Sequence, residues 1–79
     1  MEKRLKNIFI DIFKVDVKNI KDSFAMENEN LWDSLKHMEL IVTIEEEFKI
    51  EFSFDEIVIM KNFGKIKTIL IEKLTIEKH

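Results

Sequence analysis

Apolar residues recur at helical spacing in three long segments of this chain, and this pattern constrains the fold more than any other feature. In the first segment they fall at i, i+3, i+4, i+7 and i+8, the spacing of one buried helical stripe. Its members are Leu5, Ile8, Phe9, Ile12 and Phe13. Ile10 lies off this stripe, so we expect it to be partly exposed. The pattern predicts a first helix over Glu2–Lys14.

The second segment, Leu35–Phe48, carries a wider apolar arc, which predicts a helix in contact with more than one neighbour. His37 and Glu45 are polar exceptions within this arc. Its apolar members are Leu35, Met38, Leu40, Ile41, Val42, Ile44 and Phe48.

The third segment predicts a helix from Asn62, a suitable N-cap, to about Leu74. We expect residues 75–79 to fray, as chain ends commonly do. The members of the third stripe are Phe63, Ile66, Ile69, Leu70 and Leu74.

Two further segments complete the expected architecture. Ser53–Met60 predicts a short helix, because Ser53 and Glu56 have the spacing of a capping box. Val15–Trp32 is rich in turn-forming residues, yet its irregularly spaced apolar residues indicate a long loop held on the core. The expected fold is all-α, a small bundle of three main helices plus one short helix. The expected buried contacts of the short helix are Ile57, Val58 and Met60.

Length and composition restrict the class of protein. Seventy-nine residues predict a single domain, 1–79, and the absence of cysteine excludes disulfides and Cys-based metal sites. No apolar run approaches the roughly 20 residues of a membrane span. The first residues are charged and do not form an apolar signal core, so we expect a cytoplasmic protein.

Charge is unevenly distributed along the chain. Residues 1–21 carry a net charge of +3, residues 22–59 carry −9, and residues 60–79 carry +3. A nucleic-acid-binding protein would need a continuous basic face, and the acidic centre argues against that class. The acidic centre instead favours a basic protein partner.

Asp33 and Ser34 stand where the loop ends and the second helix begins. A helix start has unpaired backbone N–H groups and a partial positive charge, so a phosphate attached there would be favourably placed. Ser34 is therefore either the attachment site of a phosphate-linked group or, like Asp33, a residue that only caps the helix. The two histidines, His37 and His79, do not suit a hydrolytic triad. The acidic side chains near His37 lack convergent metal-ligand spacing, so no metal site is expected.

Three motifs together resemble the acyl carrier protein family: Asp33-Ser34-Leu35, Glu39-Leu40 and Glu45-Glu46-Glu47-Phe48-Lys49-Ile50. The resemblance covers about residues 2–74. In that family the serine of the Asp-Ser-Leu motif carries a 4′-phosphopantetheine arm from coenzyme A, attached by a separate phosphopantetheinyl transferase. The resemblance therefore implies that Ser34 is the attachment site. It also implies that the protein is not an enzyme but a free-standing carrier, which holds an acyl group as a thioester, as in fatty acid biosynthesis.

The resemblance also implies a partner surface. Family members present acidic residues of the second helix to basic patches on acyl-activating and acyl-transferring enzymes, with apolar contacts beside the arm. We expect the carrier itself to be a monomer. The matching positions in this chain are Asp33, Leu35, Met38, Glu39, Glu45 and Glu46.

The sequence departs from the common family pattern at two positions. Lys36 stands where many members have an acidic residue, and Trp32 stands where carriers of primary fatty acid synthesis commonly have a small one. These departures favour a carrier dedicated to a specialised pathway. Two alternatives remain open: an aminoacyl carrier, for example for D-alanine, and an unmodified helical adaptor in which Ser34 is only a cap.

Overall fold

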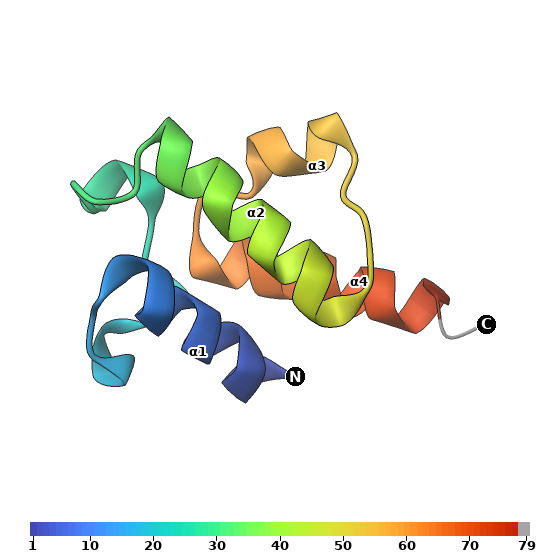
Figure 1. The fold of residues 1–79 in the computed structure, drawn as a ribbon, viewed down its shortest axis with the longest axis horizontal. Helices are drawn as coiled ribbons and strands as arrows, with labels where there is room; N and C mark the ends of the chain where they lie inside the picture. The colour runs from blue at the N-terminus through green and yellow to red at the C-terminus, as the bar shows by residue number, and fades with distance from the viewer. Residues whose placement is uncertain (78–79) are drawn as a thin grey trace.

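Four α-helices make up the computed structural model, which describes residues 1–77. In the view of Figure 1, α2 runs across the middle of the molecule, with α1 below it, α4 behind it and the short α3 above it. The all-α architecture confirms the predicted fold class. Within the described residues, no helix is both long enough and apolar enough to cross a membrane. The helices are α1 (Glu2–Phe13), α2 (Ser34–Phe48), α3 (Phe54–Ile59) and α4 (Phe63–Glu77).

The ends of the first three helices follow from local hydrogen bonds. α1 stops at Phe13 because Lys14 adopts the left-handed conformation, φ 56°, and its N–H donates to the Ile10 carbonyl at 2.8 Å. Lys49 ends α2 in the same way, with φ 59°. α3 begins with the predicted capping box: the Ser53 hydroxyl accepts from the Glu56 N–H at 3.2 Å, and the Glu56 carboxylate accepts from the Ser53 N–H at 2.7 Å.

α4 starts as predicted but ends later. The Asn62 side chain accepts a hydrogen bond from the Lys65 N–H at 2.7 Å, as expected of an N-cap. The helix continues to Glu77, so the predicted end near Leu74 and the fraying of residues 75–77 are wrong. The rest of the expected frayed segment, 78–79, lies outside the described residues.

The core forms where α1 meets the loop, α2 and α4. All five members of the predicted α1 stripe are buried, and Ile10 is half-buried as expected. Five aromatic rings pack against one another in this core, with neighbouring ring centroids 5.0–5.8 Å apart. These rings, the aromatic cluster, belong to Phe9, Phe13, Phe24, Trp32 and Phe63.

The apolar arc of α2 is wider than the area that its neighbours cover. Leu40, Ile41, Ile44 and Phe48 are buried, but the other apolar members of the arc are not. The expectation that Val58 would be buried on α3 is also wrong, because α3 is only six residues long and turns this side chain to solvent. The exposed apolar side chains of α2 are Leu35 (79%), Met38 (48%) and Val42 (47%).

The loop between α1 and α2 is held on the core, as predicted. It contains two 3₁₀ turns, η1 (Val17–Asn19) and η2 (Met26–Asn28). Two backbone hydrogen bonds of 2.8 Å join it to the start of α4, from Met26 N–H to Lys61 O and from Phe63 N–H to Phe24 O. A third joins Gly64 N–H to Asp22 O at 3.2 Å, and a Cβ at position 64 would lie 3.0 Å from the Asp22 Cβ. A side chain at this position would therefore push Asp22 away by a few tenths of an ångström.

Candidate functional site

Ser34 is the first residue of α2, and its side chain is exposed. The residue before it, Asp33, is the N-cap: its carboxylate accepts a hydrogen bond from the Lys36 N–H at 2.9 Å. Asp33 therefore fulfils the capping role that the sequence left open between the two residues. The Ser34 hydroxyl is not needed for the cap and lies in solvent beside the positive end of the helix.

A hollow of about 240 Å³ lies beside Ser34, between α2 and α3. Apart from Lys61, His37 and Ser34 itself, its lining is apolar. An exposed hydroxyl at a helix start, with a lysine nearby, fits the attachment of an anionic phosphate group. The lining side chains are Met26, Ser34, His37, Met38, Ile57, Val58 and Lys61.

His37 forms the inner wall of this hollow and joins three parts of the chain. The Trp32 indole N–H donates to His37 Nδ1 at 3.0 Å, and His37 Nε2 lies 2.9 Å from the Ile57 carbonyl of α3. An indole nitrogen can only donate, so Nδ1 is the acceptor and Nε2 carries the proton that is donated to Ile57. The sequence marked His37 as an exception in the arc, but no signal in it identified these partners.

The expected partner residues lie on two parts of α2. Those near its start surround Ser34 and are exposed, namely Asp33, Leu35, Met38 and Glu39. Glu46 is also exposed, farther along the helix. Glu45 differs from them, since it is half-buried and its carboxylate accepts a hydrogen bond from the Phe52 N–H at 2.9 Å.

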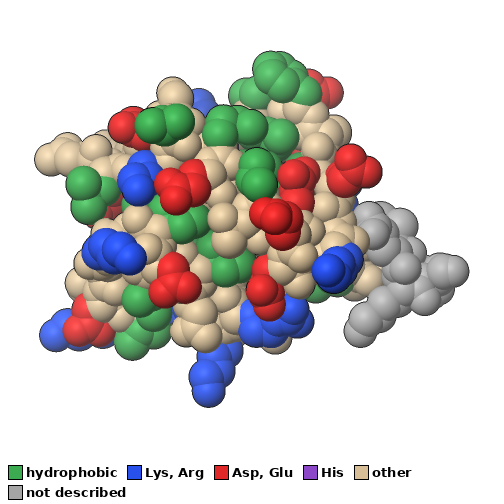
Figure 2. Space-filling model, in the orientation of Figure 1, with side chains coloured by type: hydrophobic (Ala, Val, Ile, Leu, Met, Phe, Trp, Pro, Cys, Tyr) green, Lys and Arg blue, Asp and Glu red, His purple; other side chains and the backbone are tan. Residues whose placement is uncertain are grey.

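The surface of α3 exposes apolar residues that the sequence did not predict to be exposed. Figure 2 shows hydrophobic side chains along the upper part of the molecule, over α2 and α3, with acidic side chains across its centre. Lysine and arginine side chains lie mostly toward the left, lower and right parts of this view. The exposed apolar residues of α3, with their exposed fractions, are Phe54 (78%), Val58 (46%) and Ile59 (50%). Because the periodicity of a six-residue helix is too short to separate faces, it could not show which of these side chains are exposed.

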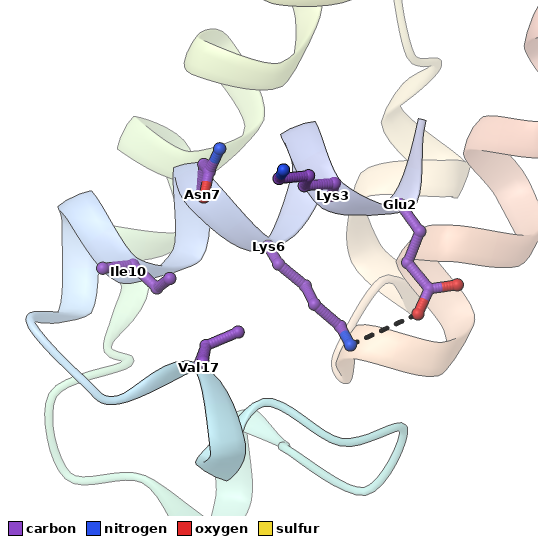
Figure 3. Close-up of a pocket in the computed structure, with 6 residues that line it drawn as sticks. All are labelled: Glu2, Lys3, Lys6, Asn7, Ile10 and Val17. Carbon is purple, nitrogen blue, oxygen red and sulfur yellow. Dashed lines mark ion pairs between the residues drawn. The ribbon is translucent and has the colours of Figure 1, made fainter.

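A larger hollow, of about 490 Å³, lies on α1 and η1 (Figure 3). There Ile10 faces Val17 across the hollow, and the Lys6 ammonium is 3.4 Å from the Glu2 carboxylate. None of the site residues predicted from the sequence lines it. Although this hollow is larger, we do not take it as the functional site, because its lining side chains do not converge on a common binding or reaction point.

Comparison with known proteins agrees with this geometry. A family model described as "Phosphopantetheine attachment site" matches residues 3–70. The chain is 38% identical over 56 residues to the acyl carrier protein of Buchnera aphidicola subsp. Schizaphis graminum (strain Sg), and the aligned region covers 71% of each chain. The solution NMR structure of a holo acyl carrier protein from Geobacter metallireducens matches with a TM-score of 0.83 and 32% identity, over 99% of this chain and 92% of that one. The chain therefore belongs to the acyl carrier protein family, whose cofactor is a covalently attached 4′-phosphopantetheine.

Proposed function

We propose that Ser34 is the phosphopantetheine attachment site and that residues 1–79 act as one acyl carrier domain. The observation that carries the proposal is the division of roles at the start of α2, within a family defined by phosphopantetheine attachment. Asp33 accepts the capping hydrogen bond, and the adjacent Ser34 presents its hydroxyl to solvent. A capping serine would be held by the helix, whereas this one is accessible to a modifying enzyme.

The attachment step forms one bond and breaks one bond. Ser34 Oγ bonds to the phosphorus of the pantetheine phosphate of coenzyme A, the diphosphate linkage breaks, and adenosine 3′,5′-bisphosphate leaves. The hydroxyl proton passes to a base of the transferase, because the one histidine within residues 1–77, His37, is buried and both its ring nitrogens are hydrogen-bonded. The helix N-terminus and Lys61, which lines the adjoining hollow, can stabilise the resulting phosphodiester.

When bound, the arm supplies a terminal thiol that holds an acyl group as a thioester. The chain's own contribution is docking, since an attached substrate shares the carrier's contacts with each enzyme and reaches a high effective concentration. We propose that basic enzymes dock on the exposed side of α2. The proposed surface comprises Asp33, Leu35, Met38, Glu39, Glu45 and Glu46.

Lys36 makes this surface less acidic than that of many family members. Its ammonium lies 3.3 Å from the Glu39 carboxylate, so it partly neutralises the acidic surface close to Ser34. A partner enzyme whose surface opposite this turn is entirely basic would be attracted less strongly here than by a carrier with an acidic residue in place of Lys36. This local charge pair supports a specialised pathway with its own partner enzymes.

Intact-protein mass tests the attachment site. The parent is incubated with coenzyme A and a broad-specificity phosphopantetheinyl transferase, beside the Ser34→Ala variant and the control Ser23→Ala, which changes another exposed serine. We expect the parent and Ser23→Ala to gain the mass of one phosphopantetheine and Ser34→Ala to gain none. No gain in the parent with several transferases, or a gain in Ser34→Ala, would contradict the proposal and favour an unmodified adaptor.

The docking surface is tested by the rate of the same modification. Leu35→Ala and the charge reversal Glu46→Lys should each lower kcat/KM several-fold, because both change exposed side chains on the proposed surface. The control Asp11→Lys reverses an exposed charge on α1 and should leave the rate unchanged. Equal losses in Glu46→Lys and Asp11→Lys would assign the charge effect to net charge and not to this surface, and an unchanged rate in Leu35→Ala would contradict the apolar contact.

A further inference from the structure

The hollow beside Ser34 is closed on its inner side by a hydrogen-bonded chain. Trp32 Nε1 donates to His37 Nδ1 at 3.0 Å, and His37 Nε2 donates to the Ile57 carbonyl at 2.9 Å. We call this chain, from Trp32 through His37 to Ile57 O, the latch. Only 2% of Trp32 and 8% of His37 are exposed, so the latch links α2 to α3 from within the protein.

Behind the latch, the space is occupied by the aromatic cluster. The Trp32 ring centroid lies 6.0 Å from that of His37, and it also lies 5.5 Å from the Phe9 centroid and 5.2 Å from the Phe13 centroid. Phe9 and Phe13 are at most 1% exposed. Inserting extra volume into such a close-packed region forces side chains from their preferred rotamers.

Parting α2 from α3 beside Ser34 would also break polar contacts. If the His37–Ile57 bond opened, the His37 N–H would be left in an apolar wall without its acceptor. Leaving a buried donor without an acceptor opposes such an opening. An alkyl chain that entered here would therefore have to offset both the lost hydrogen bond and the repacking of the aromatic cluster.

We propose that the latch confines the acyl group to the surface hollow beside Ser34, so that this carrier takes short acyl groups and does not bury a long alkyl chain between α2 and α3. The inference rests on the proposed function, because the acyl group reaches the hollow only through an arm on Ser34. The lining agrees with it, since the hollow measures only about 240 Å³ and includes the polar groups of His37 and Lys61.

The first test uses the parent protein. Butanoyl, octanoyl and dodecanoyl arms are transferred from the corresponding acyl-coenzyme A, and loading is verified by mass. We expect equal Tm values for the three forms and an unchanged Trp32 indole N–H resonance. A chain buried in the interior would instead raise Tm by about 3 °C or more per methylene in a domain of this size.

A Tm that rises with chain length, together with a shift of the Trp32 indole resonance, would overturn the proposed role of the latch. Failure to load any arm would contradict the proposed function at the mass step, before chain length is compared. The two failures are therefore distinguishable. Trp32 is the only tryptophan, so its indole resonance is assigned without ambiguity.

The second test removes the latch. In His37→Ala, the Tm of the acylated forms should rise with chain length, because the wall between the hollow and the interior is lost. Met38→Ala is the matched control: Met38 lines the same hollow but is half exposed and is not part of the latch. No chain-length effect in His37→Ala, or the same effect in both variants, would overturn the proposal. If His37→Ala does not fold, the measurements on the parent decide the question.

Discussion

Replacing Trp32 by phenylalanine tests how much stability the hydrogen-bonded chain through His37 provides. The substitution removes the indole N–H that donates to His37 Nδ1 at 3.0 Å, while an aromatic ring remains in the core. It leaves a buried acceptor without its donor, which costs about 1–3 kcal/mol. The smaller ring also leaves part of a tightly packed site unfilled, at a cost of about 1 kcal/mol. We expect the free energy of unfolding to fall by about 2–4 kcal/mol.

Urea unfolding followed by circular dichroism measures this change, since the variant has no tryptophan fluorescence. A double-mutant cycle separates the hydrogen bond from packing. In a His37→Leu background the acceptor is absent, so Trp32→Phe should cost about 1–3 kcal/mol less than in the parent. An equal cost in both backgrounds would refute the assigned role of the hydrogen bond.

The remaining predictions concern the start of α2 and the cap of α3. Ser34→Ala should change the free energy of unfolding by no more than about 0.5 kcal/mol in urea, because its hydroxyl lies in solvent. Asp33→Ala removes the cap on the Lys36 N–H and should cost about 1 kcal/mol in the same assay, without preventing the mass gain at Ser34. The Ser53 backbone N–H, which donates to the Glu56 carboxylate, holds the pKa of Glu56 below its ordinary value of 4.5. Its stabilising effect is therefore complete above that pH and lost as pH falls through the lower, folded-state value. Glu56→Gln should reduce the loss of stability in this acid range, measured by urea titration at several pH values.

Helical spacing predicted the long elements because the side chains that it selects on α1 and α4 do face the core. All five residues of the α1 stripe are buried, and the same pattern identifies Phe63, Ile66, Ile69 and Leu70 on α4. The capping box at Ser53 was predictable for a related reason, since both of its hydrogen bonds join residues three positions apart. Such features depend on neighbours in sequence.

The same reasoning misjudged α2, because periodicity reports which side chains are apolar and not which of them another element covers. Leu35, Met38 and Val42 belong to the arc but lie in solvent, where they form part of the surface near Ser34. His37, in contrast, is buried although it is polar, because its acceptor is the Ile57 carbonyl on α3. Only the tertiary arrangement of α2 and α3 brings these two groups together.

The motif Asp33-Ser34-Leu35 predicts an attachment site at Ser34, which stays a prediction, and the helix start expected at this motif is present. The sequence did not distinguish which of the first two residues caps the helix, because aspartate and serine are both suited to that role. The distinction came from the direction of the Asp33 side chain, whose oxygen reaches the Lys36 N–H. The hollow beside Ser34 was not predictable, because residues of η2, α2 and α3 together form it.

The backbone hydrogen bonds between the loop and the start of α4 have a consequence for the order in which parts of this protein can fold. Met26 bonds to Lys61, and Phe63 bonds to Phe24, so the loop that leads to Ser34 is fixed by residues from the other half of the chain. Bringing such distant segments together has an entropic cost, and the contacts that offset this cost can form only when both segments are present. During synthesis, Ser34 emerges well before its loop can be fixed. A nascent or truncated chain that lacks α4 would therefore carry Ser34 at the end of a loop without these anchoring hydrogen bonds.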